Sequence, residues 1–447
     1  MRDPRPDTRL DGRRDELDAL LRRCVQCGLC LPVCATWLAT GDETMSPRGR
    51  LLLLGDLLAQ PADGPAIDPT VSRALATCIG CQACTAACPS GVPASLLEDA
   101  VRLAAPSGPA PAAVPGVFLG RLDEPAVLAA IGTLAAVGRG ALRALLGPRW
   151  RGRLAGRRHV IATIGRLVGS VPRAPRSDRE LARCLDRLCG HGEAPTCALP
   201  AAAAPRERVL WFAGCAADGL LPESSRRLRD LARWAGAEVV QPAGTACCGA
   251  LAAHGNQPRR AEELRERNLA AWGGAGDEDG VTALVTEAAG CGVAIRGYGE
   301  RLPAPQVDAI AWLTRAGDRP PFGAVPLKVA LHDPCHARHG QGIVAEPRAL
   351  LRAVPGLVLL EPGEADACCG SGGAWGLRHP GLSAELGERK ARHLAATGAD
   401  LVVTANPGCL GQIADGLASL PHPTPPVLPL GDLLWYAAMR GAGDSRT

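Results

Sequence analysis

The chain has 447 residues, a net charge of only +4, and an apolar fraction of 47%. This length suggests about three domains, and the weak net charge argues against a nucleic-acid partner. The N-terminus is polar and charged with no apolar core segment, so we expect no signal peptide. In a reducing cytosol the 19 cysteines are therefore expected to bind metal rather than to form disulfides.

Two uncharged stretches, 103–120 and 239–258, are long enough to raise the question of a membrane span. Four prolines break the first, and polar residues interrupt the second. Neither is the predominantly apolar helix that a bilayer requires. We expect a cytoplasmic protein that could attach peripherally to the inner face of the cell membrane.

A helical domain is predicted over residues 10–105. Residues 14–23 carry leucines on one side, as an amphipathic helix does. Further along, Ser46 followed by Pro47 has the residues of a helix start, an N-cap and a first-turn proline.

Two cysteine runs, 24–34 and 78–88, lie within this helical domain, each with the spacing C-x2-C-x2-C-x3-C. That spacing binds [4Fe–4S] clusters, with the fourth cysteine of each run serving the other cluster. Pairs with C-x2-C spacing also bind zinc, but a zinc site has no use for a third cysteine at the same step. We predict two clusters, one held by Cys24, Cys27, Cys30 and Cys88, the other by Cys78, Cys81, Cys84 and Cys34.

The next region, 106–205, reads as a linker followed by a basic helical segment. Prolines and alanines dominate 104–115, and helices are expected over 120–172. Ten arginines and no acidic residue occur between 139 and 176, which fits either a solvated basic face or a docking surface for an acidic partner or anionic lipid. Three cysteines follow in a loop-like stretch that matches no metal template, and we treat them as incidental: Cys184, Cys189 and Cys197.

The C-terminal half contains an internal repeat, with units at 206–320 and 321–440. Each unit alternates strand-like and helix-like segments, with strands expected near 209, 237 and 281 and again near 328, 357 and 400. Such alternation predicts parallel sheets built from βαβ units. The expected fold class is a helical two-cluster ferredoxin-like domain followed by a tandem α/β repeat.

Each repeat unit carries four cysteines just beyond its strands, at the edge where open α/β sheets bind ligands. They are Cys215, Cys247, Cys248 and Cys291 in the first unit, and Cys335, Cys368, Cys369 and Cys409 in the second. Adjacent cysteines have poor disulfide geometry, whereas gathered thiolates suit iron–sulfur clusters or zinc. An empty dithiol and buried structural cysteines are the other interpretations. Three histidines flank Cys335: His332, His336 and His339. Each is interpreted either as a metal ligand or as a residue that supports the site or lies at the surface.

A family resemblance rests on both halves of the chain. The motifs that carry it span 24–28, 46–50 and 88–92, then 333–341, 368–373 and 404–409. Over most of 20–110 and 205–436 the chain resembles the iron–sulfur subunit of glycolate oxidase. The Cys-Cys-Gly units also resemble heterodisulfide reductase subunits, lactate-utilisation proteins and an anaerobic glycerol-3-phosphate dehydrogenase subunit. Those relatives often have a C-x2-C pair where this chain has only the second cysteine of the pair. Ala288 and Asn406 stand where the first cysteine of each pair would be.

The resemblance implies an electron-transfer subunit of an oxidoreductase complex. A partner subunit carrying FAD would oxidise glycolate or a similar 2-hydroxy acid, and electrons would leave towards a quinone or another carrier. The sequence shows no nucleotide-binding fold with a candidate general base beside it. We therefore expect FAD on the partner subunit only. Two alternatives stay open: a catalytic subunit whose C-terminal cluster reduces a disulfide or a quinone, and a zinc-stabilised scaffold.

Overall fold

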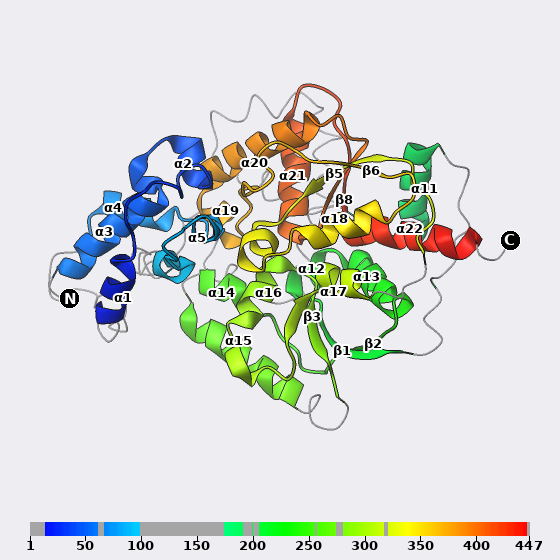
Figure 1. The fold of residues 1–447 in the computed structure, drawn as a ribbon, viewed down its shortest axis with the longest axis horizontal. Helices are drawn as coiled ribbons and strands as arrows, with labels where there is room; N and C mark the ends of the chain where they lie inside the picture. The colour runs from blue at the N-terminus through cyan, green and yellow to red at the C-terminus, as the bar shows by residue number, and fades with distance from the viewer. Residues whose placement is uncertain are drawn as a thin grey trace, which may run out of the picture.

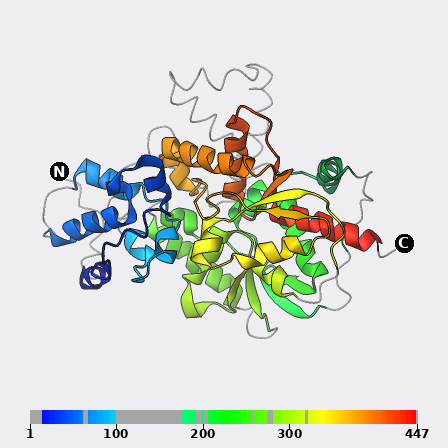
Figure 2. The same cartoon turned by 45° about the horizontal axis from the view of Figure 1, so that its top comes forward.

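The computed structural model describes residues 14–60, 67–98, 174–190, 199, 205–254, 257–273, 280–316 and 321–444. The helices expected over 120–172, most of the arginine-rich stretch and Cys197 lie outside these residues. Among the helices described, none combines the length and the apolar character needed to cross a membrane. Both ribbon views place the N-terminal helices at one end of the molecule and α22 at the other (Figures 1 and 2).

The N-terminal domain is helical in every described element, as the sequence predicts. Ser46 caps the long helix by accepting a hydrogen bond from the Gly49 amide, and Pro47 occupies its first turn. Leucines from three helices, including Leu17, Leu54 and Leu75, form its buried core. The elements are α1 (Arg14–Leu21), α2 (Ala35–Thr40), the 3-10 turn η2 (Glu43–Met45), α3 (Pro47–Ala59), α4 (Pro69–Ala76) and α5 (Ala83–Ala86).

The first repeat unit is a four-stranded, all-parallel sheet with strand order β2-β1-β3-β4. The sequence missed β4, a strand of only three residues. The elements are β1 (Glu207–Phe212), α12 (Cys215–Leu220), α13 (Pro222–Trp234), β2 (Ala237–Val240), α14 (Ala250–His254), α15 (Pro258–Gly273), β3 (Ala283–Thr286), α16 (Ala289–Arg296), η3 (Gly299–Arg301), β4 (Gln306–Asp308) and α17 (Ala309–Arg315).

The second unit repeats this topology with strand order β6-β5-β7-β8, and both units confirm the predicted fold class. Its last strand, β8, was also missed. The elements are β5 (Lys328–His332), the π-helical turn η4 (His336–Gly340), α18 (Ala345–Arg352), β6 (Val358–Leu360), α19 (Ala374–Arg378), α20 (Pro380–Ala395), β7 (Leu401–Thr404), α21 (Pro407–Ser419), β8 (Val427–Pro429) and α22 (Leu430–Asp444).

The two sheets share one hydrophobic core, because successive strand residues point to opposite faces. Val209 and Trp211 of β1 join Val329 and Leu331 of β5 in a central cluster that includes α13, α17, α18 and α22. The intervening residues pack outward, Leu210 and Phe212 against α15 and α16, and Ala330 against α20 and α21. Helices therefore separate the two sheets and also cover their outer faces.

The segment with Cys184 and Cys189 is a helix, not the loop-like stretch that the sequence suggested. Ser177 caps α11 (Asp178–Cys189), and Gly190 ends it in the left-handed conformation. Leu181 and Leu185, one turn apart, are fully buried in the central core. The packing partner is α22, more than 240 residues further along the chain, so a local sequence window could not reveal it.

Candidate iron–sulfur and thiol centres

The two cysteine runs form loops of the same backbone shape. Gln26 and Gly28, on either side of the second cysteine of the first run, have positive φ angles of 58° and 80°. Gly80 and Gln82 occupy the same places in the second run, with 70° and 63°. Residues in the left-handed conformation on both sides of the second cysteine turn the chain tightly. This turn points the cysteine side chains of each run to a common centre.

The loops enclose two hollows, each lined by one of the predicted cysteine sets. The first, of about 500 Å³, is lined by Cys24, Cys27, Cys30 and Cys88, and the second, of about 430 Å³, by Cys34, Cys78, Cys81 and Cys84. Cys84 lines both hollows, so they are neighbours. In each hollow the fourth cysteine of the predicted set comes from the other run.

The chemistry of these thiols fits a metal cluster. Burial raises the pKa of Cys84 to about 12 and that of Cys81 well above the ordinary value for a thiol. A buried thiol of this kind stays protonated at neutral pH unless a metal displaces the proton. Four converging sulfurs in an apolar hollow are the donor set of a [4Fe–4S] cluster.

Arg50 holds the two runs in register, a role that the sequence did not reveal. It lies on α3, is 1% exposed, and donates to the Ala74 carbonyl and to the hydroxyls of Thr36 and Thr77, at 2.9, 3.0 and 3.2 Å. Thr36 follows Cys34 by two residues, and Thr77 directly precedes the second run. The guanidinium therefore fixes the two segments that enter the second hollow.

In the first repeat unit the four cysteines form two sulfur pairs. Cys215 and Cys247 have their Sγ atoms 3.5 Å apart, and Cys248 and Cys291 have theirs 3.2 Å apart. Hydrogen bonds from Cys215 and Cys248 lower the pKa of Cys247, while the pKa values of both donors are raised. The pairs lie at the ends of β1 and β3, where the strand order reverses, the usual ligand position in such sheets.

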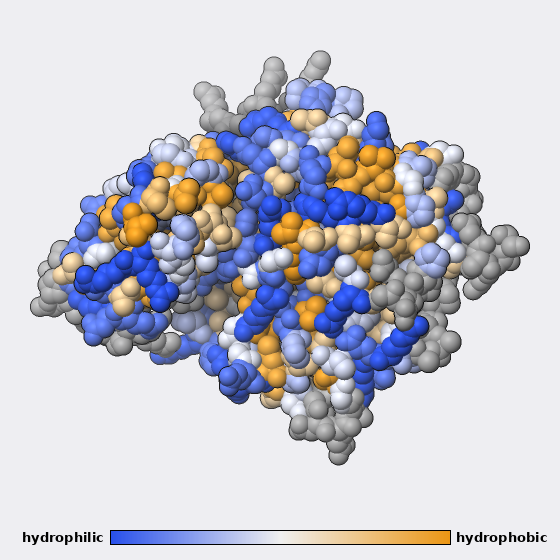
Figure 3. Space-filling model, in the orientation of Figure 1, coloured by the Kyte–Doolittle hydropathy of each residue, from blue (hydrophilic) through white to orange (hydrophobic). Residues whose placement is uncertain are grey.

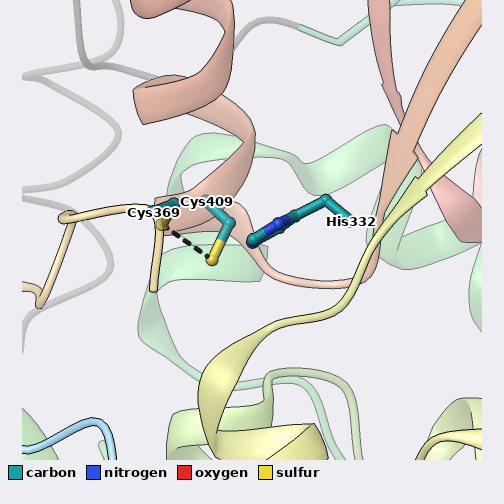
Figure 4. Close-up of side chains that lie close together, drawn as sticks. All are labelled: His332, Cys369 and Cys409. Atoms are coloured by element: carbon teal, nitrogen blue, oxygen red, sulfur yellow. Dashed lines mark hydrogen bonds between the residues drawn. The ribbon is translucent and has the colours of Figure 1, made fainter. Parts of the chain in front are cut away.

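The second unit repeats these pairs with the equivalent residues. The Sγ atoms of Cys335 and Cys368 are 3.8 Å apart, and those of Cys369 and Cys409 are 3.3 Å apart. A ring nitrogen of His332 lies within 4.8 Å of the sulfurs of Cys369 and Cys409 (Figure 4). The rings of His336 and His339 instead contact backbone carbonyls.

The second unit docks directly onto the second cysteine run. The His336 ring contacts the Gly80 carbonyl at 2.9 Å, and the Trp375 indole donates to the Thr77 carbonyl at 3.3 Å. Cys368 belongs to one buried cluster with Ile79 and Trp375, and the partly buried Cys81 and Cys335 pack against it. The second hollow and the cysteines of the second unit are thus adjacent, although more than 240 residues separate them in sequence.

A groove of about 1690 Å³ runs between the second cysteine run and the two repeat units. Cys78, Ile79 and Gly80 border it on one side and Cys248 on the other. Its remaining walls include the aromatic rings of Tyr298 and Trp375, and charged side chains of both signs: Arg265, Arg378, Glu98 and Glu262. This groove is larger than either of the two hollows that the cysteine runs line.

Comparison with known proteins agrees with this architecture. The chain matches the 4Fe-4S dicluster domain over 20–92 and the cysteine-rich domain, CCG, over 209–296 and 329–414. The fold and its cysteine sets thus define an iron–sulfur protein in which a dicluster domain is joined to a tandem cysteine-rich module.

Relatives that align over nearly their whole length narrow the class of iron–sulfur protein to which the chain belongs. The chain is 30% identical to the probable glycolate oxidase iron–sulfur subunit of Bacillus subtilis (strain 168), over 91% of this chain and 90% of that protein. It is 28% identical to the glycolate oxidase iron–sulfur subunit of Escherichia coli (strain K12), over 93% and 95%. A fumarate reductase (CoM/CoB) subunit of Methanothermobacter marburgensis is 34% identical but matches only 48% of this chain and 43% of its own length. The chain belongs to the family of glycolate oxidase iron–sulfur subunits.

Proposed function

We propose that the chain is the electron-transfer subunit of a flavin-dependent 2-hydroxy acid dehydrogenase, acting on glycolate or a close analogue. The names of its full-length relatives support this reaction. The observation that carries the proposal is the pair of adjacent four-cysteine hollows, one at the surface and one beside the large groove. When bound there, two [4Fe–4S] clusters would supply one-electron redox chemistry.

The proposed ligands are the two predicted sets. Cys24, Cys27, Cys30 and Cys88 would hold one cluster, and Cys34, Cys78, Cys81 and Cys84 the other. A Cys34→Ala variant tests the crossed arrangement, because it should remove the cluster of the second run although Cys34 lies in the first. Iron should fall from about eight to about four atoms per chain, whereas Cys184→Ala should keep all of it.

The partner subunit, which we expect to carry FAD, is proposed to dock on the loop of the first run. This loop exposes two apolar side chains, Val25 at 68% and Leu29 at 55%, and Cys27 beside them is also exposed. Apolar surface is visible on the N-terminal domain in Figure 3. Exposed aliphatic side chains next to a redox ligand are suited to a protein contact that brings a donor close.

A surface variant tests this docking. Val25→Glu combined with Leu29→Glu should keep the iron content but slow reduction of the protein by glycolate and the flavin subunit at least about tenfold, since each charge opposes an apolar contact. Val358→Glu is the matched control, because Val358 is also exposed, at 51%, but lies on β6. Glycolate oxidation by this chain alone would refute the proposed division of labour.

The electron acceptor is proposed to bind in the groove. A quinone or another small carrier would find aromatic walls at Tyr298 and Trp375 and cationic groups at Arg265 and Arg378, next to the loop of the second run. An Arg265→Gln variant should raise the KM for the acceptor and leave reduction by the flavin subunit unchanged. Equal KM values in both proteins would contradict this location.

A second candidate function is reduction of a disulfide or quinone at the first repeat unit itself. It is favoured because Cys215 and Cys247 line a separate hollow of about 1010 Å³ that also contains Arg260 and Arg267. A thiolate at Cys247 would attack a disulfide that enters this hollow and release one thiolate of it, and the neighbouring Cys215 thiol would then displace the other half and leave a Cys215–Cys247 disulfide, which electrons from the clusters would reduce again. Full activity of a Cys247→Ser variant with a disulfide acceptor would exclude this function at the first unit.

A further inference from the structure

Two arginines of α3, two residues apart, border different hollows. Arg48 lines the hollow of the first cysteine set, and Arg50 lines that of the second. The Arg48 side chain is 31% exposed and pairs with Glu43 at 2.6 Å, so water and a carboxylate both offset its charge. Arg50 is 1% exposed and, among the described residues, pairs with no carboxylate. The two hollows therefore differ in how the positive charge beside them is compensated.

Arg50 keeps its charge although it is buried. A guanidinium is not deprotonated in proteins, and the acceptors of Arg50, the Ala74 carbonyl and two threonine hydroxyls, are neutral. Only Nε and Nη2 make these bonds, and Nη1 has no acceptor in the described part of the chain. A buried charge is costly unless an anion accompanies it. An anionic group in the second hollow would supply that compensation.

One acidic residue, Glu98, also lines the second hollow. It forms no ion pair with Arg50 within the described residues, and it is half-buried, whereas Arg50 is almost fully buried. Water screens a partly exposed charge more strongly than a buried one. We therefore expect the charge of Arg50 to outweigh that of Glu98 at this hollow.

A fixed positive charge favours the reduced state of a neighbouring cluster. Four thiolates make a [4Fe–4S] cluster anionic, and reduction adds one further negative charge. A side chain that lines a hollow of about 430 Å³ lies within about 10 Å of its centre, where a unit charge at an effective dielectric constant of about 20 changes a one-electron equilibrium by at least about tenfold.

We propose that Arg50 raises the reduction potential of the cluster in the second hollow above that of the cluster in the first. One electron then passes favourably from the first cluster, beside the exposed Val25 and Leu29, to the second cluster, beside the groove. The first cluster is oxidised and the second reduced, and no atom or proton moves. The inference rests on the proposed electron-transfer function and gives that transfer its direction.

The test is a redox titration of the full chain, purified anaerobically, with dye mediators and electron paramagnetic resonance to count reduced clusters. The two N-terminal clusters should show distinct potentials, and the higher one should be absent from Cys34→Ala, which lacks the second cluster. Arg50→Gln keeps an amide donor but loses the charge. It should lower the higher potential and shift the electron distribution between the clusters at least about tenfold, which is about 59 mV for one electron.

Two further variants separate charge from structure. Arg50→Lys keeps the charge and should retain most of the difference between the two potentials. Arg48→Gln is the matched control, because it removes an exposed and already paired charge from the same helix. It should change the electron distribution between the clusters by less than about threefold.

The proposal fails if Arg48→Gln and Arg50→Gln shift the potentials equally, or if Cys34→Ala loses the lower potential. Where Arg50→Gln does not hold the second cluster, Arg50→Lys decides, because loss of that cluster or an about tenfold shift with the charge kept would overturn the proposal. Failure of glycolate and the flavin subunit to reduce the chain would refute the proposed function instead, because the dyes measure the potentials without either of them.

Discussion

Two neighbouring arginines of α13 should differ greatly in their contribution to stability. The Arg227 side chain is fully buried and pairs with the fully buried Asp432 of α22 at 3.1 Å. It also donates to Asp178 of α11 at 2.9 Å and to the Pro175 carbonyl at 3.2 Å. Arg226 contacts Asp178 too, together with Glu223 and Asp230, but it is 36% exposed.

Replacing Arg227 by methionine leaves the Asp432 carboxyl buried without its cation, a change that costs about 3–5 kcal/mol. The two repeat units together form a module for which each kcal/mol of lost stability lowers the Tm by about 2–4 °C. The apparent Tm should therefore fall by roughly 6–20 °C. Arg226→Met should cost less than about 1 kcal/mol because water screens its ion pairs, so its Tm should fall by at most about 4 °C.

Circular dichroism can follow unfolding of the C-terminal module, while visible absorbance reports the clusters separately. Arg227→Met should leave the cluster absorbance unchanged at temperatures below the new transition, because the partners of Arg227 named above lie in α11, in α22 and just before α11. Equal Tm losses in the two variants would refute the argument from burial.

The penalty should also depend on pH. Burial raises the pKa of Asp432 to about 6, although Arg227 opposes the shift. Without Arg227 this pKa rises further, and the folded state favours the protonated carboxyl. Stability from such a group is present at low pH and lost as pH rises through the folded pKa. The Tm deficit of Arg227→Met should therefore be larger at pH 8 than at pH 6, and the reverse order would contradict the assignment.

Three further predictions follow from single side chains. Burial raises the pKa of Glu287 from 4.5 to about 7, so the stability that its protonated form contributes is lost as pH rises through about 7. Glu287→Gln should therefore flatten the fall in Tm between pH 6 and 8, and an unchanged slope would contradict this. A Cβ at Gly49 would lie 1.9 Å from the Glu43 carbonyl oxygen, so Gly49→Ala should speed the loss of cluster absorbance on warming, whereas Gly55→Ala, with no neighbour closer than 4.0 Å, should not. His336→Ala removes the contact with the Gly80 carbonyl and should speed amide hydrogen exchange in the second cysteine run by roughly five- to tenfold, as loss of about 1 kcal/mol implies; unchanged exchange would show that the contact does not hold this loop.

Several features of the fold could be read from the sequence because their causes are local. Ser46 and Pro47 mark a helix start through their own backbone and side-chain chemistry, and α3 begins there. The alternation of strands and helices predicts parallel sheets, which both units show. The cysteine spacing likewise predicts two cluster sites, because three ligands of each cluster come from one short loop.

Other features were decided only by the tertiary structure, because they depend on contacts between distant segments. No spacing rule distinguishes His332 from His336 and His339, yet the end of β5 directs one ring to Cys369 and Cys409, while η4 turns the other two towards carbonyls. The packing of α11 on α22, the buried Arg50 and the groove beside the second run likewise arise from long-range packing. The sequence by itself determined which side chains can bind metal, and the packing of the two sheets and the helical domain decided which of them meet.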